Sequence, residues 1–259
     1  MDKVKVQAYL DRIGMTLDLD NFKPDYELLK QLQYAHVTHV PYENLDLVHN
    51  RIPLTLTPEA VFDKVVTRKR GGYCFELNCL FNWLLKQLGY TTVSYMARYL
   101  RGETDIPMRR HRIVVAESEY TGGRVVCDVG IGDRAPRYSL RLETDIIQEQ
   151  FGEKYRIEKD DFYGWVISDF YKGEWVRFFG FSEEVQLDID YVMPSFWCEA
   201  HPDSKFHKSN IVSLKTPTGR KTIADMTHRI FEGTEVTEIE MKSEEELNTI
   251  LRDVFGIVM

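Results

Sequence analysis

The chain has 259 residues, of which 43% are hydrophobic and 29% charged, so its composition is that of a globular protein and excludes wholesale disorder. A formal net charge of -8 opposes non-specific attraction to nucleic acid or to an anionic membrane. No stretch approaches the roughly 18 uninterrupted apolar residues of a membrane span, and residues 1–20 lack the apolar region of a signal peptide, so no membrane partner is predicted.

The first ninety residues have the periodicity of helices. Apolar residues recur at helical spacing in 6–13 and again in 28–37, and Thr57 with Pro58 supplies the N-cap and first-turn proline that begin a helix. The strongest pattern lies in 77–88, where Leu and Phe recur at i, i+3, i+4, i+7, i+8 and i+11. It stops before Gly89, which suits the left-handed position after a helix, so we predict a helix here.

After Gly89 the pattern changes to short runs of β-branched and aromatic residues separated by Gly, Asp and Pro, which predicts a meander or small barrel. The predicted strands are 91–100, 111–116, 124–129, 155–158, 162–168 and 174–179. From about residue 190 the chain contains two more strand-like runs and then a charged C-terminal helix: 210–215, 221–226 and 247–254. We therefore expect three units that pack as one compact α+β body: a helical domain (1–89), a β-barrel (90–190) and a small α/β unit (191–259).

Four cysteines are present, with no Cys-x-x-Cys pair, and they are too sparse for the disulfide scaffold of a secreted protein. Free thiols are typical of a reducing compartment, so we expect the protein in the cytoplasm. Cys79 lies about 140° around the helix from Cys74 and is interpreted as a packing residue. His36 and His39 are three residues apart, but no third ligand of suitable spacing follows them, so no metal site is expected.

Cys74 is the first candidate nucleophile. Gly71 and Gly72 lead into the predicted helix and place Cys74 in its first turn, where exposed backbone N–H groups and the helix dipole stabilise a thiolate. The glycines also let a substrate carbonyl approach the backbone, where the Cys74 amide could donate to an oxyanion. However, Cys74 also continues the apolar stripe three residues before Leu77, as a small core residue would. Position alone leaves both interpretations open.

A histidine and an aspartate are the candidate partners of this cysteine. If a four-residue loop at 118–121 joins the strands on either side, Ala116 pairs with Gly123 and His111 lies directly opposite Asp128. Opposed residues share a face with Cβ atoms about 5 Å apart, so the carboxylate could hold the imidazole in one tautomer. The alternative is a histidine at a strand edge and an aspartate in a turn.

These residues lie in segments that resemble a known family. Segment 70–78, Arg-Gly-Gly-Tyr-Cys-Phe-Glu-Leu-Asn, is similar to the Arg-Gly-Gly-x-Cys-x-Glu-x-Asn signature of the arylamine N-acetyltransferases. Segments 111–115 and 128–132 look like those that carry the family's histidine and aspartate. Further similarity spans nearly the whole chain in the same order: His36, 40–45, 204–206, Gly219 with Arg220, and 251–257. Two positions depart from the family, with Tyr42 in place of the usual Phe and Ile131 where Phe is frequent.

The resemblance implies a three-part, cysteine-protease-like fold with a helical N-terminal domain, a β-barrel and a C-terminal α/β lid. It implies an acetyl transfer from acetyl-CoA to arylamines, arylhydrazines or related amines, with a place in xenobiotic metabolism. The reaction is expected to be ping-pong through an acetyl-cysteine thioester, with Cys74 as nucleophile, His111 as base and Asp128 as orienting acid. Five residues are candidates for contact with CoA, of which all except the first could equally be turn formers: Arg70, Gly130, Gly132, Gly219 and Arg220.

Two other classes of protein compete with this interpretation. A cysteine hydrolase, such as an amidase or peptidase, uses the same Cys-His-Asp triad with water as the acceptor. A binding module could retain the fold without catalysis. The complete triad disfavours the binding module, and the resemblance along the whole chain disfavours the hydrolase. The physiological amine, the range of acyl donors and the oligomeric state are not determined by the sequence.

Overall fold

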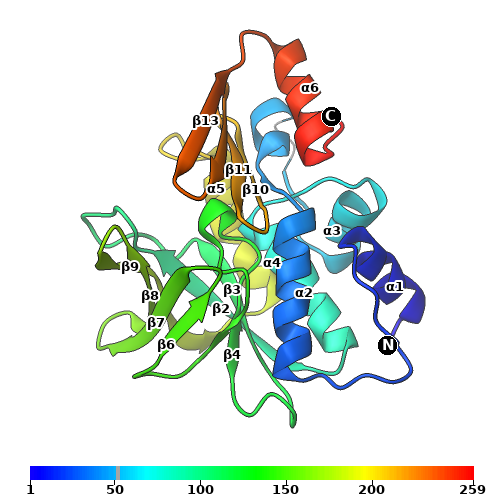
Figure 1. The fold of residues 1–259 in the computed structure, drawn as a ribbon, viewed down its shortest axis with the longest axis vertical. Coiled ribbons are helices and arrows are strands. Elements are labelled where there is room, and N and C mark those ends of the chain that lie inside the picture. Colours follow the sequence, from blue (N-terminus) through cyan, green and yellow to red (C-terminus); the bar gives the residue numbers. More distant parts are fainter. Residues whose placement is uncertain (51–52) are drawn as a thin grey trace.

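The computed structural model describes residues 1–50 and 53–259, and its N-terminal part is helical, as the sequence predicts (Figure 1). Asp2 and Asp25 cap the first two helices by accepting hydrogen bonds from the backbone N–H groups of Lys5 and Leu28. Thr57 caps the third in the same way. The helices are α1 (Lys3–Arg12), α2 (Tyr26–His39), α3 (Pro58–Phe62) and α4 (Cys74–Gln87), with π-helical turns at Asp46–Asn50 and Asp63–Thr67.

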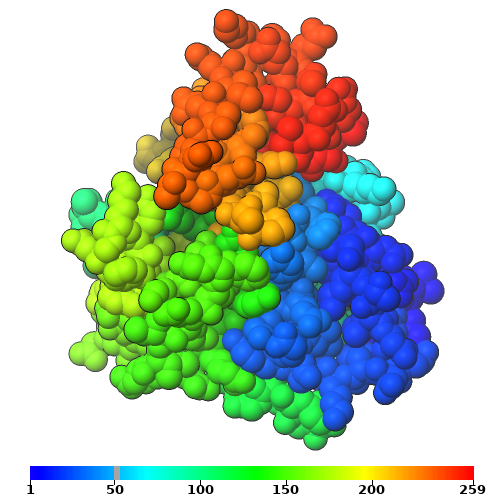
Figure 2. Space-filling model, viewed as in Figure 1, coloured from blue at the N-terminus to red at the C-terminus, as the bar shows by residue number. Residues whose placement is uncertain are grey.

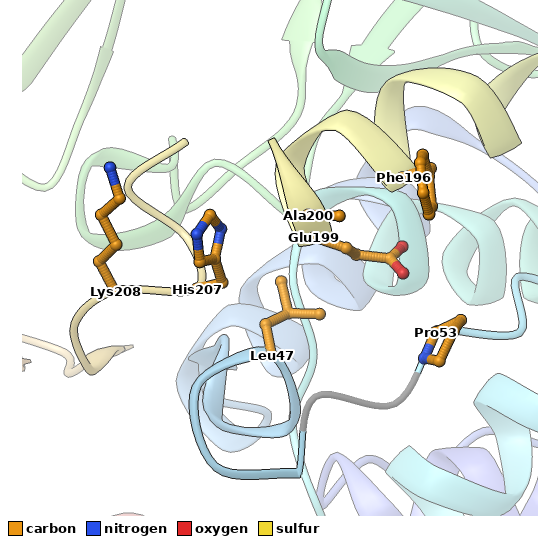
Figure 3. Close-up of a pocket in the computed structure, with 7 residues that line it drawn as sticks. All are labelled: Leu47, Pro53, Phe196, Glu199, Ala200, His207 and Lys208. Atoms are coloured by element: carbon orange, nitrogen blue, oxygen red, sulfur yellow. The ribbon is translucent and has the colours of Figure 1, made fainter. Parts of the chain in front are cut away.

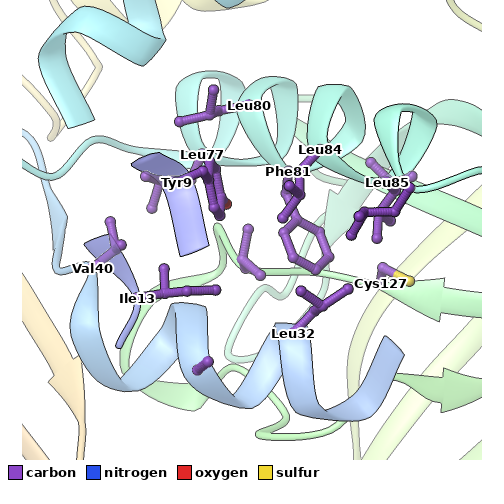
Figure 4. Packing of buried hydrophobic residues seen from close by; sticks show 14 of the residues in the cluster. Tyr9, Ile13, Leu32, Val40, Leu77, Leu80, Phe81, Leu84, Leu85 and Cys127 are labelled. Carbon is purple, nitrogen blue, oxygen red and sulfur yellow. The ribbon is translucent and has the colours of Figure 1, made fainter. Parts of the chain in front are cut away.

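Helix α4 is the centre of the largest hydrophobic core. It begins at Cys74, where the Glu76 carboxylate accepts from the backbone N–H of Tyr73, and it ends before Gly89, whose φ is +87°. The predicted apolar stripe is fully buried, and Figure 4 shows Phe81 and Leu85 of α4 pointing toward α2, which carries Leu32. The packing of α4 in this core therefore fixes the position of its N-terminus, where Cys74 lies.

The middle of the chain forms an eight-stranded, nearly closed antiparallel barrel with strand order β5-β4-β3-β2-β9-β8-β7-β6. Its strands are β2 (Thr91–Tyr99), β3 (His111–Glu117), β4 (Val125–Cys127), β5 (Leu140–Arg141), β6 (Ile147–Gln150), β7 (Glu153–Asp160), β8 (Gly164–Tyr171) and β9 (Glu174–Val185). The two edge strands are linked by glutamine side chains. Gln148 bonds both the N–H and the C=O of Arg141, and Gln150 bonds the same groups of Tyr138. These amides satisfy backbone groups that an open sheet edge would leave unpaired.

The hairpin register that we predicted between β3 and β4 is wrong by two residues. Ala116 pairs with Val125 rather than with Gly123, because Gly122 and Gly123 both adopt positive φ and lengthen the turn after Thr121. A shift of two residues preserves which face of the sheet each side chain occupies. His111 and Asp128 therefore still lie on one face, although they are diagonal rather than directly opposite.

The C-terminal part contains more structure than the sequence predicts. Two expected strands, β10 (Ile211–Lys215) and β11 (Gly219–Ala224), belong to a five-stranded sheet with β12 (Thr227–Glu232), β13 (Glu235–Glu240) and β1 (Tyr42–Glu43). Strand β1 comes from the N-terminal part, so the C-terminal sheet is built from both ends of the chain. The remaining elements are the 3-10 turns Gly132–Arg134 and Asp188–Tyr191, the helix α5 (Val192–Ala200), which we did not predict, and the expected α6 (Glu244–Phe255).

The three parts pack against one another. Figure 2 shows the C-terminal residues resting on both the barrel and the N-terminal helices. A small buried cluster at this junction contains Tyr73, Cys74, Phe75, Tyr191 and Cys198. Among the described helices, none is both long enough and apolar enough to cross a membrane.

Candidate active site

Cys74 is the first residue of α4 and is 5% exposed. Its Sγ lies 3.9 Å from the carbonyl oxygen of Arg110. Burial raises the pKa of the thiol, and Cys198 raises it further, while hydrogen bonds from the backbone at Arg112 and Phe75 lower it. Burial therefore opposes the stabilisation of a thiolate that we expect from the helix N-terminus.

His111, the first residue of β3, lines the same cavity as Cys74 and is 5% exposed. Its Nε2 lies 2.6 Å from Oδ2 of Asp128, and the edge of the ring meets Phe179. When the carboxylate is ionised, Nε2–H is the donor in this hydrogen bond. Nδ1 is then the unprotonated ring nitrogen and is free to accept a proton from another group.

Asp128 follows β4 and is 2% exposed. Its Oδ1 accepts from Asn78 Nδ2 and from the backbone N–H of Gly130, both at 2.9 Å. Its backbone N–H donates to Gln33 of α2. The carboxylate is therefore held by α4, by its own turn and by His111, and the backbone of Asp128 is held by α2.

Sequence reasoning noted Asn78 only as the last residue of the family signature and gave it no role, although it joins the segments that carry Cys74, His111 and Asp128. Its Nδ2 also donates to the carbonyl of Arg112, at 2.6 Å, and its Oδ1 accepts from the N–H of Val129, at 3.0 Å. Asn78 lies four residues after Cys74 on the same face of α4. A polar residue on an otherwise apolar helix face was the signal in the sequence that could have identified it.

Cys74 and His111 line one cavity of about 460 Å³ between the barrel, the N-terminal part and the C-terminal sheet. Gly130 closes one wall of this cavity, since a Cβ on it would lie 2.7 Å from Cα of Cys74 and 2.8 Å from Nδ2 of Asn78. The other lining residues combine aromatic and charged side chains: Tyr42, Tyr99, Glu103, Arg110, Ile131, Gly132, Asp133, Lys205, Phe206, Ile211, Val212, Ser213, Thr222, Ile223, Ala224, Arg229 and Phe231. A small aromatic molecule fits the volume and the lining of such a cavity.

The five candidate CoA residues separate into three groups. Gly130 and Gly132 line the active-site cavity. Arg70 does not line it, because its buried guanidinium pairs with Glu43, at 2.9 Å, and with Asp46, at 3.1 Å.

The last two candidates, Gly219 and Arg220, have structural partners. The carbonyl of Gly219 accepts from Arg137, and its Cβ position is occupied by the backbone of Phe231. Arg220 pairs with Asp133 and lines a different cavity. Arg70, Gly219 and Arg220 do not line the active-site cavity, and their contact with CoA stays a prediction.

The other residues singled out in the sequence have packing roles. The Cys79 thiol is buried and donates to the carbonyl of Leu56, at 3.3 Å. His36 is buried in α2, with Nδ1 2.6 Å from the hydroxyl of Tyr9. Within residues 1–50 and 53–259, no group of three or more His, Cys, Asp or Glu side chains could hold a metal ion.

A larger cavity, of about 650 Å³, lies beside α5 (Figure 3). Figure 3 shows Phe196 and Glu199 of α5 on one side of it and His207 and Lys208 on the other. Its described lining also includes Leu47, Pro53 and Ala200, and none of these seven residues is a cysteine, serine or threonine. The smaller cavity at Cys74 is therefore the candidate active site.

A buried cysteine beside a histidine–aspartate pair, in a cavity between a barrel and a lid, is typical of cysteine-dependent acyl-transfer enzymes. Residues 25–259 match the family described as N-acetyltransferase. The arylamine N-acetyltransferase of Mycobacterium tuberculosis is 30% identical over 253 residues, covering 96% of this chain and 88% of that protein.

Solved structures agree with the sequence match. The structure of the M. tuberculosis arylamine N-acetyltransferase has a TM-score of 0.89 at 30% identity and covers 97% of this chain and 92% of that one. An M. marinum arylamine N-acetyltransferase in complex with CoA has a TM-score of 0.89 at 28% identity, with the same coverage. The chain belongs to the arylamine N-acetyltransferase family. It is an acyltransferase, and the three-part α+β fold implied by the resemblance is confirmed.

Proposed function

We propose that the protein transfers an acetyl group from acetyl-CoA to an arylamine, an arylhydrazine or a related amine through an acetylated Cys74. The observation that carries this proposal is the hydrogen bond between His111 Nε2 and Asp128, which leaves Nδ1 as the base in the cavity that Cys74 lines. The M. marinum relative in complex with CoA and the relatives named as arylamine N-acetyltransferases support the choice of donor and acceptor.

The first half-reaction acetylates the enzyme. His111 Nδ1 takes the proton of the Cys74 thiol, and the thiolate attacks the acetyl carbonyl of acetyl-CoA. We take the backbone N–H of Cys74 as a donor to the oxyanion that forms. The adduct collapses when the carbon–sulfur bond to CoA breaks, and the imidazolium returns its proton to the leaving CoA thiolate. Asp128 stabilises the imidazolium between these two steps.

The second half-reaction releases the product. The amine attacks the Cys74 thioester, and His111 takes a proton from the amine nitrogen of the adduct. Breaking of the carbon–sulfur bond expels the Cys74 thiolate, which His111 reprotonates, and leaves the acetylated amine. Water would compete at this step, so the C-terminal sheet acts as a lid that excludes it. In these two half-reactions every proton and leaving group is accounted for by His111, Cys74 and the two substrates.

Gly130 and Gly132 remain our candidates for the approach of CoA, because both line the cavity and neither carries a side chain that would block it. We also place the protein in the cytoplasm, on the ground that its four cysteines are free thiols. A role in xenobiotic metabolism would follow if foreign arylamines are accepted.

Mass spectrometry and steady-state kinetics test the proposal. We expect acetyl-CoA alone to add one acetyl group to a Cys74 peptide, an arylhydrazine to remove it, and double-reciprocal plots to be parallel when both substrates vary. An adduct that only water removes would instead support the cysteine hydrolase. Intersecting lines without an adduct would show direct transfer and contradict the mechanism.

Two cysteine variants form a matched pair for the same test. Cys74→Ala should abolish acetyl transfer while the protein remains folded, because little volume is lost in the first turn of α4. Cys79 lies on the same helix, and Cys79→Ala should retain most activity, since this thiol bonds the backbone of Leu56 and the side chain of Arg112 and does not line the active-site cavity. An active Cys74→Ala enzyme would exclude Cys74 as the nucleophile.

A further inference from the structure

A second polar cavity, of about 200 Å³, lies where the barrel meets the lid, on the far side of Asp133 from the active site. It is lined by the turn 132–134, by β7 and β8 of the barrel and by β10 and β11 of the lid (Figure 1). We call it the barrel–lid cavity. Its lining residues are Asp133, Arg134, Gly152, Glu153, Lys154, Tyr155, Asp169, Phe170, Tyr171, Lys215 and Arg220.

Positive charge exceeds negative charge around this cavity. Lys215 and Arg137 are both about 4% exposed, and both approach Oε1 of Glu153 at 3.0 Å, so two buried cations share one carboxylate. The hydroxyl of Tyr155 donates to the other oxygen of Glu153. The carboxylate is thus fully engaged and does not neutralise both of its partners.

The other two carboxylates at the cavity have cations of their own. Asp133 pairs with Arg220, at 3.0 Å, and Asp169 pairs with Arg101. Arg134 lies over the ring of Tyr171, with its Cζ 4.2 Å from the ring centroid, and has no carboxylate partner among the described residues. Lys154, which also lines the cavity, pairs with Glu149 outside it, at 2.8 Å. The remaining five cations therefore face three carboxylates, which leaves two positive charges without a partner in a small, partly buried space.

The lowered pKa of Lys215 agrees with this excess of positive charge. Burial lowers the pKa of Lys215 to about 8, and Arg137 lowers it further, against the opposing effect of Glu153. Burial and the neighbouring Arg134 also lower the pKa of Arg101. A bound anion would relieve both effects, because an anion favours the charged form of a nearby cation.

We propose that the barrel–lid cavity binds a phosphate group, held by Lys215 and Arg134. A phosphate dianion matches the two uncompensated charges, and arginine and lysine are the side chains that recognise phosphate. The group can be inorganic phosphate or a phosphomonoester such as the 3′-phosphate of CoA. Because the ligand would contact β7, β8, β10 and the turn 132–134 together, it would stabilise the lid against the barrel beside the active site.

Thermal unfolding in sodium phosphate and in sodium chloride at equal ionic strength tests binding without any substrate. We expect phosphate to raise the Tm of the wild-type protein by roughly 3–6 °C per tenfold increase above its dissociation constant. Arg134→Gln should lose most of this response and should still fold, because Arg134 is half-buried and pairs with no described carboxylate. Arg156→Gln, on β7 outside the cavity, should respond as the wild type does, including any general stabilisation by phosphate. Equal responses of all three proteins would overturn the proposal.

Equilibrium titration with CoA and dephospho-CoA distinguishes the source of the phosphate group. If the 3′-phosphate of CoA occupies the cavity, Arg134→Gln weakens the binding of CoA about tenfold or more and leaves dephospho-CoA unchanged. If both coenzymes bind the variant as they bind the wild type, and only the inorganic phosphate response is lost, the cavity takes a separate phosphate. The thermal response does not depend on acetyl transfer, so its loss and a failure of the proposed function are independent results.

Discussion

The aspartate of the proposed triad is the most constrained residue of the site. Asp128 is bonded by His111, Asn78 and the N–H of Gly130, and its own N–H is bonded to Gln33. This constraint matters for the proposed mechanism, in which a correctly oriented His111 takes the proton of a thiol whose pKa is raised by burial. In that mechanism the reactivity of Cys74 depends on the hydrogen-bonded group as well as on the helix terminus.

Asp128→Asn tests this dependence. The amide would donate to Nε2 of His111, so the ring would present a protonated Nδ1 to Cys74 and could not accept the thiol proton. We expect turnover to fall by about 10³ to 10⁴, as in other triads with this substitution. Iodoacetamide reactivity measured against pH should show a higher thiol pKa in the variant. Equal thiol pKa values in the two proteins would remove Asp128 from the triad.

Arg110 places a positive charge next to the catalytic pair. Its guanidinium lies 5.6 Å from the ring of Trp197 and 6.0 Å from that of Phe206, and its carboxylate partner Glu103 is 3.7 Å away and one-third exposed. The charge is therefore only partly neutralised within the cavity.

We expect acceptors that carry a carboxylate to benefit from this charge. The kcat/KM for 4-aminobenzoate should exceed that for its methyl ester, and Arg110→Gln should lower it about tenfold or more, the effect of losing a hydrogen bond to a charged group. The methyl ester should be little affected. Arg109→Gln, which removes the exposed neighbour paired with Glu184, is the matched control. Equal losses for the acid and the ester would mean that Arg110 only supports the cavity wall.

At the scale of elements, α1 and α2 are joined by a buried polar contact within an apolar interface. His36 of α2 is fully buried, with its ring bonded to the hydroxyl of Tyr9 of α1 and edge-on to Phe81 of α4. Burial lowers the pKa of His36 to about 3, and the nearby Arg12 lowers it further. The folded protein therefore keeps this histidine neutral at pH values where the unfolded chain protonates it.

This difference makes the packing of α2 sensitive to acid. Below the unfolded pKa of about 6.5 the unfolded state binds a proton that the folded state does not, so the free energy of unfolding falls as pH decreases toward 3. We expect His36→Gln to reduce the slope between pH 6 and pH 4 by up to about 1.4 kcal/mol per pH unit in urea unfolding. His39→Gln, on the same helix, should leave the slope unchanged. If the free energy of unfolding depends on pH in the same way in the wild type and in His36→Gln, the acid sensitivity does not come from His36.

Helices and strands with a clear apolar periodicity or capping residue could be predicted from the sequence, and those without such a pattern could not. The stripe in 77–88 predicted α4, which is buried along most of its length, and the cap at Thr57 predicted α3, in which Val61 is buried. Strand β13 is exposed at all six residues, so it shows no alternation, and β5 has only two residues. These strands exist because neighbouring strands and the Gln148 side chain pair with them, which is tertiary information.

The residues of the candidate site also divide into those that the sequence could predict and those that it could not. Cys74, His111 and Asp128 could be proposed from their spacing and from the family resemblance. The β3–β4 register was wrong, because the positive φ of Gly122 and Gly123 lengthens the turn. Asn78 and Gln33 were missed, because their partners lie 34 to 103 residues away along the chain.

At the scale of the whole molecule, Asn44 is one of the residues that attach the lid to the N-terminal part. Asn44 is 2% exposed and follows β1, which pairs with β10. Its Nδ2 donates to the carbonyls of Phe206 and Ser209, at 2.7 and 2.9 Å, and its Oδ1 accepts from the N–H of Ile211, at 2.7 Å. Phe206 and Ile211 line the active-site cavity, so this one side chain positions the lid segment that covers Cys74.

Asn44→Ala should therefore change the fate of the acetyl-enzyme as well as the stability of the protein. Three buried hydrogen bonds are lost, which should lower the free energy of unfolding by roughly 2–4 kcal/mol. A loosened segment at 206–211 would admit water to the thioester, so hydrolysis of acetyl-CoA without an amine should rise several-fold relative to transfer with one. Both rates can be followed as release of CoA at a temperature where the variant is folded.

Asn82→Ala separates a specific effect on the lid from general destabilisation. Asn82 is buried, bonds Thr92 of β2 and does not line the cavity, so its loss should lower stability without changing the ratio of hydrolysis to transfer. If Asn44→Ala loses stability but keeps the wild-type ratio, the lid does not exclude water and protection of the thioester must come from the cavity walls around Gly130. If the ratio rises only in Asn44→Ala, the attachment of the lid through β1 and Asn44 favours transfer over hydrolysis at the same triad.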